Sequence, residues 1–355
     1  MRGDCTCSSY FNLLNHNEIG QRSLEDVIGI FGRQLRALGH TAIWDQKNDK
    51  FVQNGGFNVV VEGFTHQTIG LLANAHAQGC RFLILATEEP TLKDPNGSYS
   101  DPANWKGFNH GTQVEMIQRM FAFPHAAKFC EGILHLVPGE HVKNWYGQFA
   151  RASYVELGYA PSLERWQGQP EPDYDFGFYG SGTPRRERLL KRLARRCNLS
   201  NLAIRCCFDF KTQDERDREM RRAKVVLQIR KFESMGLVSS SRCNTALMIG
   251  RPVVAEPHML SKPWDEIVTF TRRRSDEEIA GKTGHEAGCQ CGVCKEARTN
   301  EEVEEFFAKA MMVKAMWKQV WRGQLDKFKA KLSPDLCAQK AMEELGVFEP
   351  KNKAA

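Results

Sequence analysis

The sequence predicts an α/β protein made of two Rossmann-like, doubly wound domains followed by a helical extension. Three observations predict this architecture. Short apolar runs alternate with longer amphipathic stretches through most of the 355 residues, as repeated βαβ units require. A polar, proline-containing segment interrupts the alternation once, and the alternation then begins again. The last part of the chain carries a long helical pattern without strands.

The first half is expected to form one Rossmann-like domain over residues 1–160. Its near-continuous apolar runs are typical of parallel strands that are covered on both faces. The expected strands are 40–44, 57–64, 81–89, 130–138 and 152–159. Amphipathic stretches between them predict helices at 22–39, 66–79 and 111–123.

A linker and a second Rossmann-like domain are expected next. Residues 161–173 contain three prolines and few aliphatic side chains, which favours a linker. The domain that follows spans 174–275, with strands at 174–181, 202–210, 223–230 and 251–257 and helices at 184–196 and 239–250. Two such domains are expected to place a ligand between them, at the carboxyl ends of the strands.

The C-terminal part is expected to hold a Cys/His-rich loop at 276–300 and helices at 301–355. Residues 301–331 predict one long amphipathic helix, with acidic residues first and basic residues last, an order that complements the helix dipole. Its large apolar side chains are expected to face a core: Phe306, Met311, Met312, Met316, Trp317, Trp321 and Phe328.

Composition excludes some classes of protein. Apolar residues make up 41% of the chain and charged residues 26%, as in ordinary globular proteins. No run approaches the roughly 20 apolar residues of a membrane helix, and the N-terminal residues lack the apolar stretch of a secretory signal. We therefore expect a cytoplasmic protein. The net charge of +6 suits anionic ligands such as nucleotide diphosphates.

The most informative segment follows the strand at 174–181. Gly180, Ser181, Gly182 and Thr183 lead directly into a helix, so backbone N–H groups at the positive end of that helix are placed to bind a diphosphate. Arg185 or Arg186 would add positive charge. The alternative is an ordinary tight turn. The spacing fits neither the dinucleotide fingerprint nor the P-loop.

A second segment follows the strand at 223–230. Ser239, Ser240 and Ser241 are placed to cap the next helix or to donate hydrogen bonds to a phosphate or ribose. Arg242 is placed to pair with phosphate, and Glu256 to accept hydrogen bonds from ribose hydroxyls. Capping without a ligand is the alternative.

Together these segments resemble the C-terminal domain of GT-B-type glycosyltransferases, most closely the spore-maturation-like (CgeB-like) group. That group typically reads S-R-x-F-E-A-L-A-x-G-x-P-V-V-S-E where this chain has SSSRCNTALMIGRPVVAE. The first half resembles it through QRSLEDVIGIFGRQLRALGHTAIW and FLILATEE, so the resemblance covers about residues 10–260. It implies two domains that face each other across a cleft, with the donor nucleotide mainly on the second and the acceptor mainly on the first.

One departure from the family pattern concerns the donor. Asn244 and Thr245 stand where the family has Phe-Glu, so the glutamate that often holds the donor ribose is missing. The resemblance leaves that role to Glu256 or Glu233, or to Asn244 and Thr245 themselves.

Sugar transfer needs a base and a stabilised leaving group. The favoured bases are Glu88 and Glu89, with His16 and Glu18 behind them, and Glu62, His66 and His110 also lie on loops of the first half. Arg230, Lys231 and Arg242 are candidates to neutralise the departing diphosphate, so no cofactor is expected for the chemistry beyond the nucleotide-sugar co-substrate.

A separate motif lies at 284–297. Its soft ligand residues are His285, Cys289, Cys291 and Cys294, a set that suits a structural zinc ion. Cys5 or Cys7 is an alternative fourth ligand, and a loop with free thiols is the alternative to a metal site.

We therefore expect a glycosyltransferase that moves a sugar from a nucleotide sugar to a glycan, protein or small molecule. One alternative is a phage-like, DNA-modifying glycosyltransferase that acts on a hydroxymethylated base, with the basic residues 184–196 and Arg272–Arg274 on the DNA backbone. Another is a nucleotide-binding or scaffold protein without catalysis, which the missing glutamate motivates.

Overall fold

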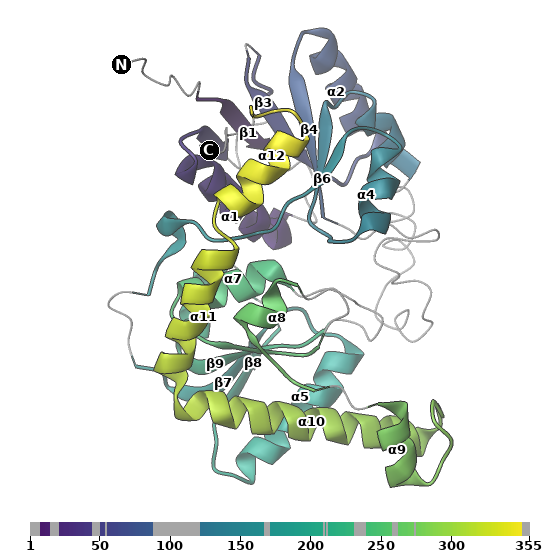
Figure 1. Ribbon diagram of the computed structural model, residues 1–355, viewed down its shortest axis with the longest axis vertical. Helices are drawn as coiled ribbons and strands as arrows, with labels where there is room; N and C mark the ends of the chain where they lie inside the picture. The colour runs from purple at the N-terminus through teal and green to yellow at the C-terminus, as the bar shows by residue number, and fades with distance from the viewer. Residues whose placement is uncertain are drawn as a thin grey trace, which may run out of the picture. The chain divides into compact units, whose positions relative to one another are not determined.

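The chain folds into two compact α/β units, each built on its own parallel sheet (Figure 1). The computed structural model describes residues 8–14, 21–44, 50–53, 55–87, 121–166, 171–208, 210, 212–230, 239–257, 262–272 and 275–349. The first unit is Met1–Leu163 with Lys329–Ala355, and the second is Glu164–Phe328. The first change of unit falls inside the segment expected as a linker. The predicted α/β class with a helical C-terminal region is confirmed.

The first sheet has the strand order β2-β1-β3-β4-β5-β6, and every described pairing in it is parallel. Its strands are β1 (Tyr10–Leu14), β2 (Thr41–Trp44), β3 (Phe57–Val61), β4 (Arg81–Ala86), β5 (Gly132–His135) and β6 (Ala152–Tyr154). The sequence did not predict β1, which lies between β2 and β3. It is short and carries the polar Asn12, whose amide donates to Asn58 Oδ1 over 3.1 Å in the buried sheet.

Helices cover both faces of this sheet (Figure 1). They are α1 (Gln21–Ala37), α2 (His66–Ala77), α4 (Glu140–Gly147) and α12 (Lys340–Glu344). Residues 121–127 are also helical, and the rest of the helix expected at 111–123 lies outside the described residues. Short turns of helix lie at η3 (Pro161–Leu163) and η4 (Asp335–Gln339). Thr65 and Thr68 form a capping box that fixes the start of α2.

The second sheet has the order β11-β10-β9-β7-β8 and is also parallel. Its strands are β7 (Tyr174–Tyr179), β8 (Ile204–Cys207), β9 (Ala223–Gln228), β10 (Val253–Ala255) and β11 (Thr269–Phe270). The described helices around it are α5 (Pro184–Asn198), α6 (Gln213–Arg221), α7 (Ser240–Met248), α8 (Trp264–Ile267), α9 (Asp276–Thr283), α10 (Gly292–Ala315) and α11 (Trp317–Lys331). In Figure 1, α5 and α10 lie on one side of the sheet, and α7 and α8 on the other.

The prediction of a single helix over 301–331 is wrong. The helix α10 begins earlier, at Gly292, and the chain breaks at Met316, whose φ of −129° and ψ of 35° are not helical, before α11 begins. Phe306 packs into the core formed with α5 and β9, whereas Met312 and Met316 are 63% and 56% exposed, contrary to expectation. The break turns the chain, so one apolar stripe cannot continue along both helices.

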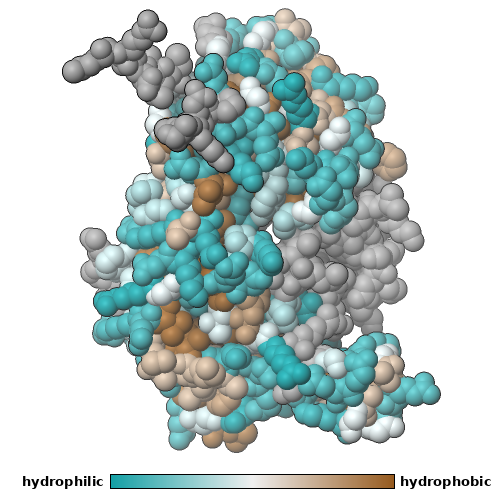
Figure 2. Space-filling model, in the orientation of Figure 1, coloured by the Kyte–Doolittle hydropathy of each residue, from teal (hydrophilic) through white to brown (hydrophobic). Residues whose placement is uncertain are grey.

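The described surface is mostly hydrophilic in the space-filling view, and hydrophobic side chains appear in small patches (Figure 2). Among the described residues, no helix combines the length and the apolar character that crossing a membrane requires.

Candidate functional site

The strand order of the second sheet creates a natural ligand site at β7 and β9. From β7 the chain passes to β8 on one side, and it returns to β9 on the other side. At such a reversal the connections after the two strands diverge, which leaves a crevice at their carboxyl ends. Both segments predicted to bind the donor belong to this edge: Gly180–Thr183 follow β7, and Arg230 follows β9.

The structure brings the two predicted segments together. Gly180 lies so close to Arg242, in the first turn of α7, that a Cβ at Gly180 would stand 2.7 Å from the Arg242 Nη2 atom. Arg242 also donates a hydrogen bond from Nη1 to Gln228 Oε1 at the end of β9. The position of the Arg242 guanidinium group therefore depends on the absence of a Cβ atom at Gly180 and on the carboxyl end of β9.

The turn between β7 and α5 presents backbone donors. Thr183 is the N-cap of α5, and its Oγ1 accepts a hydrogen bond of 3.3 Å from the Arg186 amide. Ser181 and Gly182 are exposed, and within the described residues neither of their amides has a hydrogen-bond acceptor. Since α5 is 15 residues long, these amides lie at the positive end of a substantial helix dipole.

Arg186 ties this turn to β9. Its Nη1 donates to the carbonyl oxygen of Ser181 over 2.9 Å, and its Nη2 donates to that of Ile229 over 2.9 Å. Burial, together with the nearby charge of Arg242, lowers the pKa of Arg186 below its ordinary value. Both guanidinium groups lie over the Phe178 ring, with Arg186 Cζ 5.3 Å and Arg242 Cζ 5.8 Å from its centroid.

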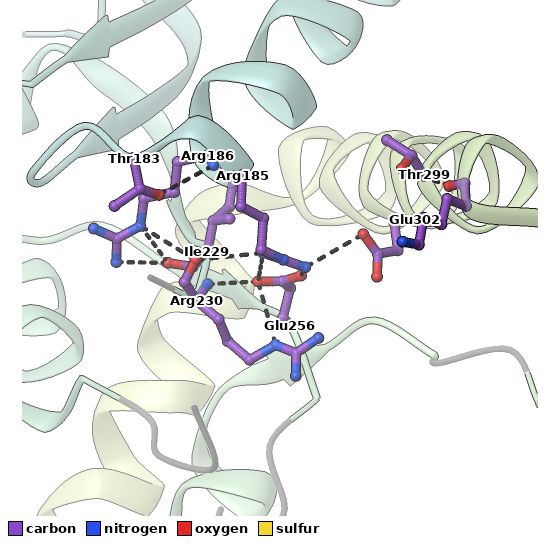
Figure 3. Close-up of polar contacts among 9 residues, drawn as sticks. Thr183, Arg185, Arg186, Ile229, Arg230, Glu256, Thr299 and Glu302 are labelled. Carbon is purple, nitrogen blue, oxygen red and sulfur yellow. Dashed lines mark hydrogen bonds and ion pairs between the residues drawn. The ribbon is translucent and has the colours of Figure 1, made fainter. Parts of the chain in front are cut away.

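Arg185 forms a buried ion pair with Glu256 (Figure 3). Arg185 Nη1 donates to Glu256 Oε2 over 3.0 Å, and Nη2 donates to the other carboxylate oxygen. The Arg230 amide donates to the same carboxylate, and Glu302 of α10 lies 3.3 Å from Arg185 Nη2. Burial alone would raise the pKa of Glu256, but the charges and hydrogen bonds of Arg185 and Arg230 outweigh it, so this pKa is lowered.

This network changes the role expected for Glu256. Its side chain is 2% exposed, and both carboxylate oxygens accept hydrogen bonds from the protein. The sequence identified Glu256 as a partner for ribose hydroxyls because it follows a strand. Its engagement by Arg185 and Arg230 depends on α5 and on the chain after β9, which are distant in sequence.

The start of α7 differs from the capping prediction. Ser239 occupies the N-cap position but its side chain makes no capping hydrogen bond. Ser240 and Ser241 are half-buried, whereas Asn244 and Thr245 are buried within the helix packing.

Several predicted residues lie outside the described part of the chain: His16, Glu18, Glu88, Glu89, His110, Lys231 and Glu233. His66 is described, and it is the exposed first residue of α2. Glu62, directly after β3, accepts a 2.6 Å hydrogen bond from Thr87 Oγ1 at the end of β4.

Sequence reasoning missed a polar group beside Glu62. The hydroxyl of Tyr146 lies 3.4 Å from Glu62 Oε2, and the Tyr146 ring stacks on His135 with centroids 5.8 Å apart. Within the described residues, the buried Nε2 atom of His135 has no hydrogen-bond partner. Burial lowers the pKa of His135. Because His135 lies within an apolar strand pattern, the sequence gave no sign of its contact with Tyr146.

The basic residues of α5 differ in exposure, since Arg188, Lys191 and Arg195 are exposed. Arg185 and Arg186 are buried, and Arg192 and Arg196 pair with Glu296 and Glu304 of α10, at 3.3 and 3.2 Å. These acidic partners oppose the charges of Arg192 and Arg196, which lowers the net positive charge that this helix offers to a DNA backbone.

A cavity of about 300 Å³ lies between α5 and the α9–α10 region. Its lining includes Arg188, Arg192, Arg230, Gln290, Lys295 and Arg298, together with acidic residues. Among the described residues of the predicted donor set, Arg230 alone belongs to this lining, so the cavity is largely separate from the turn at Gly180–Thr183.

The predicted metal ligands come together where the loop after α9 meets the first turn of α10, and their ligand atoms lie within 4.8 Å of one another: His285, Cys289, Cys291 and Cys294. Cys5 and Cys7 lie outside the described residues.

No family model matches the sequence, and no curated protein matches it. Among solved structures, the chain is similar to the catalytic domain of starch synthase IV from Arabidopsis thaliana bound to ADP and acarbose, with a TM-score of 0.48 and 9% identity, covering 96% of this chain and 100% of that one. It is also similar to a glycosyltransferase from Rickettsia africae ESF-5, with a TM-score of 0.47 and 8% identity, covering 95% and 97%. For TarM the TM-score is 0.44 and the identity 10%, covering 82% of this chain, which spans only 54% of TarM. These similarities concern the folding pattern and assign no activity to this chain.

Proposed function

We propose that this protein is a glycosyltransferase with a nucleotide-sugar donor, and that its second unit binds the donor diphosphate between Gly180–Thr183 and Arg242. The observation that carries the proposal is the close approach of Gly180 and Arg242 at the reversal of strand order. A glycine at this point lets a guanidinium group lie against backbone donors, an arrangement suited to phosphate oxygens.

The local charge supports an anionic ligand. The amides of Ser181 and Gly182 lie at the positive end of α5. Four guanidinium groups lie at this edge, whereas its carboxylates are Glu256 and Glu302 of the network and Glu187, whose Oε1 atom would stand 3.0 Å from a Cβ at Gly182. The guanidinium groups belong to Arg185, Arg186, Arg230 and Arg242. This excess of positive charge favours a diphosphate over a neutral ligand.

The choice of a nucleotide sugar rests on further features. The turn Gly180–Thr183 fits neither the dinucleotide fingerprint nor the P-loop. The order of the two segments resembles the donor domain of GT-B glycosyltransferases, and the chain has two parallel, doubly wound units as that fold requires.

We assign different roles within the site. Ser240 and Ser241, which are half-buried, contact the nucleoside part of the donor, whereas the buried Asn244 and Thr245 take part in the packing of α7. Glu256 acts as a positioning residue, because it holds Arg185 and the Arg230 amide. Arg230, Lys231 and Arg242 stabilise the departing diphosphate, and Glu88 or Glu89 deprotonates the acceptor, with His16 and Glu18 as the next candidates.

Nucleotide binding tests the donor site directly. UDP, GDP and ADP and their sugars should be screened for stabilisation of the full chain, since a ligand at 100 times its Kd adds about 2.7 kcal/mol to the free energy of unfolding. Arg242→Gln should weaken binding of the best nucleotide by roughly 10- to 150-fold, because a charged hydrogen bond contributes about 1.5–3 kcal/mol.

A matched arginine provides the control. Arg205 lies on β8 with a side chain that is 61% exposed, so Arg205→Gln should leave nucleotide affinity unchanged. Gly180→Ala should behave like Arg242→Gln, because the added methyl displaces the guanidinium group. Equal affinity in all three variants, or no stabilisation by any of the nucleotides, would contradict the donor site.

Slow hydrolysis of the donor in the absence of acceptor tests the catalytic part. The stabilising nucleotide sugar should release its nucleotide in a time-dependent way. Glu88→Gln and Glu89→Gln should be compared for loss of turnover with unchanged nucleotide affinity. Tight nucleotide binding without turnover of any donor would instead indicate a binding protein.

A further inference from the structure

The loop between α9 and α10 gathers four soft ligand atoms around one point. The ligand atoms of His285, Cys289, Cys291 and Cys294 all lie within 4.8 Å of one another. The Nδ1 atom of His285 lies 3.1 Å from Cys291 Sγ, 3.4 Å from Cys294 Sγ and 3.6 Å from Cys289 Sγ. This loop joins α9 to the start of α10 in the second unit (Figure 1).

Hydrogen bonding alone does not account for this arrangement. A ring nitrogen of neutral histidine carries either one proton or one lone pair, so His285 Nδ1 can serve one sulfur atom and not three. A tetrahedral zinc ion with Zn–S bonds of about 2.3 Å and Zn–N bonds of about 2.0–2.1 Å holds sulfur and nitrogen ligands about 3.6 Å apart. The three observed distances, from 3.1 to 3.6 Å, lie at or slightly below that separation.

The backbone holds the ligands in place. Gly284 ends α9 in the left-handed conformation, at a φ of 71°, and Gly288 turns the loop at a φ of 80°. Cys291 is the N-cap of α10 and Cys294 lies in its first turn, so both side chains are held by the start of that helix. Because only glycine readily adopts these φ values, the two glycines permit the tight return of the chain from His285 to Cys291.

A second contact closes the same loop. Arg298 of α10 donates to the Cys289 carbonyl oxygen over 2.9 Å, and it pairs with Asp276 of α9 at 2.9 Å. Cys294 is buried and lies 3.5 Å from Thr283 Oγ1 at the end of α9. Residues of both helices therefore converge on the cluster, as the surroundings of a structural metal site do.

We propose that His285, Cys289, Cys291 and Cys294 bind one zinc ion, which joins the end of α9 to the start of α10. Four protein ligands complete a tetrahedral site, so the ion is structural and carries no water for catalysis. Gln290 and Gly292, which alternate with the cysteine ligands, line the cavity beside Arg230. The ion thus also fixes one wall of that cavity.

Metal analysis of the full chain tests the site. Protein purified with reductant and without chelator should contain one zinc ion per chain by inductively coupled plasma mass spectrometry. Cys289→Ala combined with Cys291→Ala should lose that zinc. Cys207→Ala should keep it, because Cys207 is a free cysteine of the same unit that lies outside the cluster.

Two further measurements keep the proposal independent of variant folding and of the proposed transferase function. Replacement of zinc by cobalt in the wild-type chain should give a thiolate-to-cobalt charge-transfer band. Removal of zinc by chelation should increase hydrogen exchange in residues 276–300, while strands β7 and β9 keep their protection. Wild-type protein from zinc-supplemented medium that contains no zinc, or a double variant with undiminished zinc, would overturn the proposal whatever the nucleotide assays show.

Discussion

Replacement of Glu256 by glutamine tests the buried network at the proposed donor site. Glu256→Gln removes the negative charge that Arg185 and the Arg230 amide share, while it keeps the shape of the side chain. Arg185 is 8% exposed, so it cannot regain full hydration. Removal of one partner from a buried ion pair costs about 3–5 kcal/mol, and we expect a loss in this range.

An exposed pair in the first unit gives a matched control. Arg81 and Glu131 form two hydrogen bonds of 2.6 Å, but their side chains are 43% and 42% exposed. Glu131→Gln should therefore cost less than about 1 kcal/mol. Urea unfolding gives both free energies, and hydrogen exchange of β9 and β10 shows whether the loss is local to the second unit. Equal losses in the two variants would refute the reasoning.

The pH dependence of this difference follows from the pKa of Glu256. Since that pKa is lower in the folded chain, its stabilisation is complete above the unfolded value of about 4.3 and is lost as the pH falls through the folded value. The stability difference between wild type and Glu256→Gln should stay constant from pH 7 to about pH 5 and shrink below it. A stability difference between the two proteins that grows as the pH falls would contradict a lowered pKa of Glu256.

Three further outcomes are expected. Phe306→Ala should lower the free energy of unfolding by about 3–5 kcal/mol because the ring is buried against α5 and β9. Met312→Ala, at an exposed position of α10, should change it by less than about 0.5 kcal/mol. Similar values for the two variants would place α10 outside the core. Gly158→Ala should destabilise the first unit by about 1–3 kcal/mol, because the new Cβ would lie 2.3 Å from the Leu332 carbonyl oxygen. Gly70→Ala lies within α2, where a Cβ meets no neighbour, and should stabilise the same unit by about 0.5–1 kcal/mol in thermal unfolding. Burial lowers the pKa of His135 in the folded chain, so on acidification the imidazole binds a proton in the unfolded chain before it does so in the folded chain. The free energy of unfolding should therefore fall as the pH drops below about 6.5. His135→Asn should reduce this fall in urea unfolding at different pH values, and an unchanged pH dependence would exclude His135 as its source.

The sequence determined the class of fold because burial on both faces of a parallel sheet requires continuous apolar strands. The runs at 57–64, 81–89 and 223–230 therefore predicted β3, β4 and β9 with little ambiguity. It did not predict β1, since a short strand with the polar Asn12 lacks that pattern. The break at Met316 also left no signal, because the apolar residues Phe306, Ala310, Val313, Trp317, Trp321 and Phe328 keep a spacing of three, four or seven residues across it.

The site shows the same division. Glycine, serine and arginine after apolar strands identified Gly180–Thr183 and Arg242 from local pattern alone, and the spacing of His285 and three cysteines identified the ligand cluster. Only the tertiary structure decided that Arg242 lies against Gly180 and that Glu256 pairs with Arg185, 71 residues away in sequence. Likewise, only it placed His135 beside Tyr146 and Glu62. Local propensity and periodicity depend on residues that are close together in the sequence. Partners across a sheet depend on strand order, which the sequence pattern does not specify.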